Sequence, residues 1–237
     1  MTFKAMDVME RVATTLQDED SVRWPAAELH NYLNDGLREI VTLKPNALST
    51  TVNLELVAGT KQVLPATYTV LSRVSRNMTD ATTGSTAIRA LDSRSVMDSM
   101  VPGWQDASVI PNAAKVVHVI HDMADPNVFY VVPGNDGNGM IEAVVGVLPT
   151  ASPVPASSPG SISSYTDDLD MPDIYMNALV DYLLFRAYSK DARIAGSSAR
   201  AQAHYQLFRD GVTGFANAEA GMSLATHAST IQQAREG

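Results

Sequence analysis

Apolar positions in the first 46 residues recur at helical spacing. The segment AMDVMERVATTLQDE places Met6, Met9, Ala13 and Leu16 three or four residues apart. A second segment follows Trp24-Pro25, and proline suits the first helical position because it lacks the N–H that is unpaired there. The apolar face of this second segment, which Pro45 ends, consists of Leu29, Tyr32, Leu33, Leu37, Ile40 and Val41. The spacing predicts an N-terminal helical hairpin over residues 1–46.

Between residues 47 and 148 the apolar period shortens to two. In STTVNLE, Val52 and Leu54 alternate with polar residues, as in a half-buried strand, and the chain turns at Ala58-Gly59. The other strand-like runs are TYTVLSRVSRNM, AIRALD, VVHVIHDM, NVFYVV and MIEAVVGVL. DSRSVMDSM predicts a short helix capped by Asp92. We therefore expect an antiparallel β domain of some six or seven strands, either a barrel or a sandwich.

The glycine-rich stretch PGNDGNG, residues 133–139, lies between two of these runs. A dinucleotide-binding loop would be followed by a helix, but a strand pattern follows here. A calcium loop needs several acids, and Asp136 is the only one in the stretch. Asparagine and glycine tolerate positive φ, so the stretch predicts the turn of a β-hairpin.

Residues 149–169 differ in composition from the segments on either side. PTASPVPASSPGSISSYTDD holds four prolines and eight serines and threonines, which predicts an extended, exposed loop or arm. Asp167, Asp168 and Asp170 could hold a cation. Capping of the next helix explains them better, because carboxylates are favoured at helix N-termini.

Helical spacing returns over residues 170–221. The first of two segments starts at Asp170-Met171-Pro172, and its apolar residues are Ile174, Ala178, Leu179, Tyr182, Leu183 and Phe185. The second carries Ala201, Tyr205, Phe208, Val212 and Phe215. We expect an α+β fold, in which two N-terminal and two C-terminal helices form one four-helix bundle with the antiparallel β domain inserted. Residues 222–237 form a short polar tail.

Composition and charge exclude several classes of protein. Of 237 residues, 45% are apolar, enough for a substantial core, and no cysteine is present for disulfides, thiolate zinc sites or a thiol nucleophile. The net charge is −9, with 11 basic and 20 acidic residues before position 171 and six of each after it. This acidic balance argues against a protein that binds DNA by neutralising its phosphates with clustered Lys and Arg. The start of the chain lacks a signal-peptide core and no run suits a membrane helix, so we expect synthesis in the cytoplasm.

HVIHDMAD superficially resembles a metal site. It supplies His118, His121, Asp122 and Asp125, but positions 118 and 121 of a strand point to opposite faces. The chain has no GxSxG, SxxK or GxxxxGK[ST] motif. We expect no catalytic residue, no metal and no cofactor, and hence a protein that is not an enzyme.

Two helical segments resemble a known family. WPAAELHNYLNDGLREIVTLKP is similar to a helix of the head-to-tail adaptor (connector) proteins of short-tailed bacteriophages. The Pro-Asp helix start in MPDIYMNALVDYLLFRAYSKDA resembles the matching feature in the C-terminal half of that family.

The resemblance implies a structural virion protein at the head–tail junction. Such adaptors form a homo-oligomeric ring, usually of twelve copies, between the portal protein and the tail tube or nozzle protein. DNA passes through the lumen and no membrane is involved. The resemblance also implies that the tail, residues 222–237, docks to the portal, with Ile231, Gln232 and Arg235 as contact residues.

Three alternatives stay open at this point. The first is a tail-completion or stopper ring protein, which the sequence barely separates from an adaptor. The second is a ligand- or carbohydrate-binding β module carried on a helical bundle, although only 6% of the residues are aromatic. The third is a metal-dependent hydrolase that uses His118, His121 and Asp122.

Overall fold

The chain divides into two compact units. A computed structural model describes residues 2–91, 93–121, 125–191 and 193–222, with side chains up to residue 214. The helical unit consists of residues 1–44 and 149–237, and the sheet unit of residues 45–148. Within the described residues, no helix has both the length and the hydrophobicity that crossing a membrane requires.

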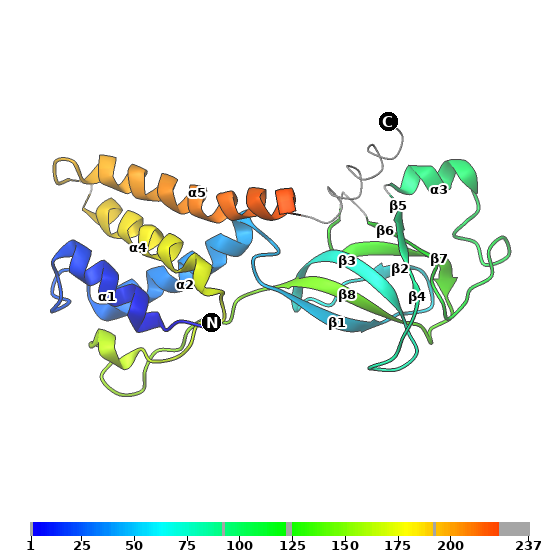
Figure 1. The fold of residues 1–237 in the computed structure, drawn as a ribbon, viewed down its shortest axis with the longest axis horizontal. Coiled ribbons are helices and arrows are strands. Elements are labelled where there is room, and N and C mark those ends of the chain that lie inside the picture. Colours follow the sequence, from blue (N-terminus) through cyan, green and yellow to red (C-terminus); the bar gives the residue numbers. More distant parts are fainter. Residues whose placement is uncertain (1, 92, 122–124, 192, 223–237) are drawn as a thin grey trace. The chain divides into compact units, whose positions relative to one another are not determined.

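Four α-helices pack together in the helical unit (Figure 1). They are α1 (Ala5–Leu16), α2 (Ala26–Leu43), α4 (Met176–Lys190) and α5 (Ser197–Met222). Helix α4 contacts each of the other three. The buried residues of α1 and α2 include Met9, Leu29, Leu33 and Ile40, as helical spacing predicts. The expected bundle of two N-terminal and two C-terminal helices is therefore confirmed.

The two helical hairpins start slightly differently from the expectation. Helix α2 begins at Ala26, so Pro25 occupies the N-cap position and not the first helical position. The 3-10 helix η2 (Asp173–Tyr175) precedes α4. Ile174 in this short helix is 45% exposed, whereas Tyr175 is buried, so Ile174 is not part of the apolar stripe. The tighter 3-10 turn changes which side chain faces the core.

The three aspartates before α4 do not cap it. Residues Pro172 and Tyr175 hold the N-cap positions of η2 and α4, and neither helix has a side-chain cap hydrogen bond. The backbone of Asp168 instead pairs with Lys4 in an isolated antiparallel bridge. The N–H of Leu169 donates to the carbonyl oxygen of Phe3 at 2.8 Å. Backbone hydrogen bonds to Phe3 and Lys4 therefore hold the segment around Asp168.

The expectation of an exposed arm over residues 149–169 is wrong for its C-terminal half. Ile162, Tyr165 and Leu169 are buried, and a 3-10 helix, η1 (Ile162–Ser164), lies among them. The N–H of Met6 donates to the carbonyl oxygen of Tyr165 at 3.0 Å. Three large apolar side chains anchor a segment whose mean composition is polar.

Two separate four-stranded sheets form the sheet unit. The first has the order β1-β8-β3-β4, with β1 (Ser49–Glu55), β8 (Met140–Val147), β3 (Tyr68–Met78) and β4 (Gly84–Ala87). The second has the order β2-β7-β6-β5, with β2 (Gly59–Val63), β7 (Val128–Asn135), β6 (His118–His121) and β5 (Arg89–Leu91). Among the described strands neither sheet closes on itself, so the unit has the form of a sandwich and not of a closed barrel.

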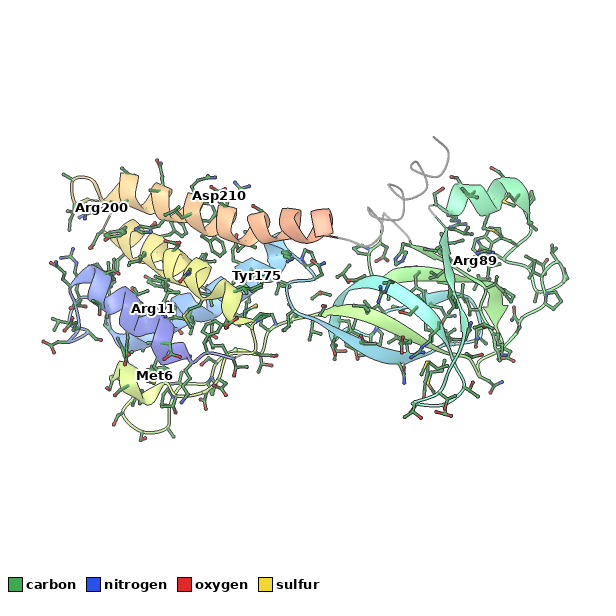
Figure 2. The ribbon with its side chains drawn as sticks, viewed as in Figure 1. Met6, Arg11, Arg89, Tyr175, Arg200 and Asp210 are labelled. Carbon is green, nitrogen blue, oxygen red and sulfur yellow. The ribbon has the colours of Figure 1, made fainter. Side chains whose placement is uncertain are left out.

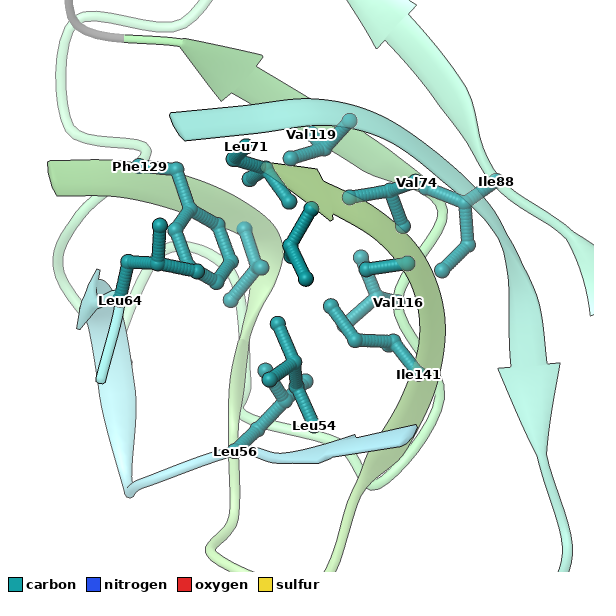
Figure 3. Packing of buried hydrophobic residues seen from close by; sticks show 13 residues of the cluster. Leu54, Leu56, Leu64, Leu71, Val74, Ile88, Val116, Val119, Phe129 and Ile141 are labelled. Atoms are coloured by element: carbon teal, nitrogen blue, oxygen red, sulfur yellow. The ribbon is translucent and has the colours of Figure 1, made fainter. Parts of the chain in front are cut away.

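The main core of the sheet unit takes side chains from both sheets (Figure 3). Leu54, Val74 and Ile141 come from the first sheet, and Val119 and Phe129 from the second. All five are at least nine-tenths buried. This core explains the period-two pattern, because alternate residues of each strand point inward.

The sheets are not wholly antiparallel, which corrects the expectation. Strands β5 and β6 run parallel, and the chain between them carries α3 (Arg94–Met100). A parallel pair needs a long crossover, usually helical, and this segment supplies one. Ser93 and not Asp92 holds the N-cap position of α3, and Asp92 itself lies outside the described residues.

The hairpin predicted at PGNDGNG is also wrong. Strand β7 pairs with β2 and β6, whereas β8 pairs with β1 and β3, so the stretch carries the chain from one sheet to the other. Glycine at position 137 is still used for its conformational freedom, since Gly137 has φ +93°. Pairing between strands is not local information, and a sheet-to-sheet connection uses the same residue types.

Candidate interaction surfaces

The histidines of β6 do not form a metal site with described residues. His118 and His121 lie at the two ends of β6, three residues apart, and therefore point to opposite faces. Nδ1 of His118 is buried without a partner among the described residues, but a single nitrogen does not hold a metal. Burial lowers the pKa of His121. Asp122 lies outside the described residues, and the described ones contain no cluster of three or more candidate ligands.

Asn135 uses all its side-chain polar groups to hold the PGNDGNG connection. Its Nδ2 donates to the carbonyl oxygens of Ala113 and Ala114, both at 3.1 Å. Its Oδ1 accepts from the N–H groups of Gly137 at 2.8 Å and Gly139 at 3.0 Å. Asn135 is fully buried. The connection is an internal clamp, because the glycine N–H groups that a phosphate would need are already bonded.

Ion pairs join the N-terminal helical hairpin to the C-terminal one. Arg186 Nη1 of α4 lies 3.0 Å from Asp35 Oδ2 of α2, and its guanidinium stacks 4.7 Å from the ring centre of Tyr32. Lys190 Nζ lies 2.6 Å from Glu28 Oε2. Planar stacking together with the hydrogen bond favours arginine at position 186. These contacts tie residues about 150 positions apart in the sequence into one body.

The carboxylate of Glu28 also accepts a hydrogen bond from the hydroxyl of Tyr32 at 2.7 Å. Burial and this bond raise the pKa of Tyr32 to about 12. The α2–α4 interface therefore combines buried apolar residues with a fixed polar margin.

A polar cleft of about 440 Å³ opens at the end of the helical unit where the α1–α2 connection meets the start of α5. Arg23 lies 2.7 Å from Asp191 and 5.2 Å from the ring centre of Trp24. Arg200, labelled on α5 in Figure 2, lies 5.7 Å from the ring centre of Tyr188. The lining residues are Thr15, Leu16, Gln17, Arg23, Trp24, Tyr188, Asp191, Ile194, Ser197 and Arg200. Both guanidiniums of the cleft therefore lie over aromatic rings of the same chain.

The helix-bearing crossover of the sheet unit exposes apolar side chains. Val96 and Met100 lie one turn apart on α3, and Met100 is 72% exposed. On the inner side of the same segment, Met97 and Trp104 are buried in a second core cluster with Tyr130. Trp104 Nε1 donates to Asp98 Oδ1 at 2.8 Å, which fixes the indole. Val96 and Met100 thus expose apolar surface on a segment that Met97 and Trp104 anchor to the sheet unit.

Some residues with long-range contacts in the structure are ones for which the sequence predicts no role. Asn135, Trp104 and Arg186 each make contacts with residues distant in the chain, and no local motif announces such contacts. Conversely, Ile231, Gln232 and Arg235, the predicted portal contacts, lie outside the described residues.

The chain was compared with protein-family models and with curated proteins. The model of the protein family described as SU10 adaptor protein matches residues 1–230. No curated protein matches the chain.

Proposed function

Because the chain belongs to the SU10 adaptor protein family of phage head–tail adaptors, we propose that it forms a ring between the capsid portal and the tail. The protein has a structural role and is not an enzyme. The observation that carries the proposal is the extent of the family match, which spans both the helical unit and the sheet unit.

The proposed ring contains twelve copies and encloses a lumen through which DNA passes, located in the virion at the head–tail junction. A net charge of −9 supports transit without binding, because like charges keep the phosphates from adhering to the wall. The partners are the portal protein on one side and a tail tube or nozzle protein on the other. The exposed apolar residues of α3 and the polar cleft of the helical unit are surfaces that such partners could cover.

The proposed portal contact is the C-terminal tail, residues 222–237, through Ile231, Gln232 and Arg235. The tail continues from α5, whose buried residues Phe208 and Val212 hold that helix to the bundle. A segment that follows a well-anchored helix can reach a partner without disturbing the fold that carries it.

Deletion of residues 224–237 tests this assignment. The shortened protein should keep the thermal unfolding midpoint of the full chain and should fail to bind isolated portals in co-sedimentation. A matched variant with Ile231, Gln232 and Arg235 all replaced by alanine should lose binding in the same way. If the shortened protein binds portals normally, the tail is not the portal contact.

A further inference from the structure

Strand β1 presents an unpaired and regular backbone edge. It is a terminal strand of its sheet, and its pairing with β8 runs over seven residues without a register shift. The N–H of Leu56 donates to Gly139, its direct partner, and the N–H of Val147 donates to Leu48. Since hydrogen-bonded pairs alternate in an antiparallel ladder, the even-numbered residues of β1 bond to β8.

The odd-numbered residues of β1 therefore direct their N–H and C=O groups away from β8. These are Ser49, Thr51, Asn53 and Glu55, and all four are exposed. Among the described residues, no further strand pairs with them. The edge thus offers four donors and four acceptors in one row.

The other three edges of the sheet unit are protected. Strand β4 has a register shift against β3, and β5 has only three residues. Strand β2 also has a register shift against β7. Bulges and short length are usual ways to block an edge, and β1, with seven residues in regular register, has neither. It also contains no proline or lysine.

We propose that β1 pairs with β1 of a second copy of this chain in the free protein. A two-fold axis at Val52 gives antiparallel pairing of the whole strand, in which Ser49 faces Glu55 of the second copy and Thr51 faces its Asn53. All four outward residues then form hydrogen-bonded pairs, which makes eight backbone hydrogen bonds. The contact joins the β1-β8-β3-β4 sheets of the two copies into one continuous sheet of eight strands.

The side chains of β1 are self-complementary in this register. Glu55 is the only charged residue of the strand, and it lies at one end. Antiparallel overlap places the two Glu55 carboxylates at opposite ends, about 20 Å apart for six residues of strand. Each carboxylate faces a serine hydroxyl, and each threonine faces an asparagine whose Nδ2 already donates to the carbonyl oxygen of Ala81 at 2.7 Å. Parallel pairing would instead set the two carboxylates side by side, which is unfavourable.

This pairing does not depend on the proposed ring. It closes an edge that the described strands leave open, and it uses only the sheet unit of the free protein. If the portal-docking experiment fails, the pairing of β1 is not affected. If β1 does not pair, the proposed ring is not affected.

Cysteine crosslinking tests the register directly, because the chain contains no cysteine of its own. Ser49→Cys and Glu55→Cys proteins are purified separately, then mixed and treated with a mild oxidant or a short thiol crosslinker. Directly opposite residues in a hydrogen-bonded pair lie about 5.5 Å apart between Cα atoms, within the range for a disulfide. The mixture should yield a crosslinked dimer. Each variant alone should not, since equal positions lie about 20 Å apart.

Removal of one outward N–H provides the second test. Thr51→Pro takes away a donor that β8 does not use, and an edge strand tolerates proline there. In sedimentation equilibrium the unmodified chain should reach twice its 25.4 kDa mass with rising concentration, and Thr51→Pro should stay at 25.4 kDa with an unchanged circular dichroism spectrum. Thr51→Ala, which keeps the N–H, should dimerise as the unmodified chain does.

Three results would overturn the proposal. They are a folded unmodified chain that stays monomeric at high concentration, equal crosslinking of the single variants alone, and a dimer that survives Thr51→Pro.

Discussion

A Cβ atom added at Gly36 would lie 2.9 Å from Cδ1 of Tyr182. Helices α2 and α4 therefore approach as closely as glycine allows, at the interface that joins the N-terminal and C-terminal hairpins. Tyr182 in turn packs edge-on against Phe208 of α5, with ring centres 5.0 Å apart. One glycine thus sets the spacing of three helices.

Gly36→Ala should destabilise the helical unit by about 1–3 kcal/mol, because overpacking outweighs the better helix propensity of alanine. Gly214→Ala is the matched control, since nothing lies within 4 Å of a Cβ at that helical position. It should stabilise the protein by up to about 1 kcal/mol. Denaturant unfolding measures both values. Equal stabilisation by the two substitutions would show that the α2–α4 contact is not tight.

Asn135→Ala should destabilise the sheet unit by more than about 2 kcal/mol, because it empties a fully buried side-chain position and leaves the carbonyl groups of Ala113 and Ala114 and two glycine N–H groups without their partner. Asn138→Ala, in the same connection but exposed, is the control and should change the unfolding free energy by less than about 0.5 kcal/mol. Thermal unfolding of the two variants gives the comparison. Similar losses at both positions would mean that Asn135 is not the clamp.

Acid should weaken the helical unit through His30. The ring is buried against Tyr165, with Nε2 3.4 Å from Asn34 Nδ2, and burial lowers the pKa of His30 below 6.5. The folded state therefore favours the neutral ring. Its contribution to stability is complete above the ordinary pKa and is lost as the pH falls below 6.5 toward the lowered value.

The unfolding free energy should fall between about pH 7.5 and pH 5.5, and His30→Phe should reduce this slope. His121 in the sheet unit has a pKa lowered by burial as well, so part of the slope should persist in the variant. An identical slope in the variant and the unmodified chain would rule out His30 as a source.

The histidines of β6 should bind no stoichiometric zinc, because they point to opposite faces of the strand. Metal analysis of purified protein checks this. His118→Gln with His121→Gln should leave the metal content and the binding to portals unchanged. Zinc in equimolar amount that disappears in the double variant would revive the metal-site interpretation.

Local patterns predicted the helices well and the strand partners poorly. The apolar spacing at Leu29, Leu33 and Ile40 depends only on neighbours along one helix, and all three are buried. The strands around PGNDGNG were also located, but their pairing depends on residues far away. The period-two pattern cannot show that β7 and β8 belong to different sheets.

Predictions from mean composition and from charge near a helix start were wrong for residues 149–169 and for Asp168. Proline and serine dominate residues 149–169, yet Ile162, Tyr165 and Leu169 decide where that segment packs. Asp168 was read as a helix cap, but its backbone pairs with Lys4 from the other end of the chain. Arg186 and Asn135 act through distant partners, so only the folded chain identifies them.

The mass of the protein free and on the portal tests the central claim most directly. Native mass spectrometry of the free chain should show monomers and dimers. The portal complex should contain a fixed number of copies, twelve on our account, and no partial rings. Portals that carry a variable number of copies or none, or a complete ring in the free protein that ignores portals, would contradict the assignment as a portal-docked adaptor ring.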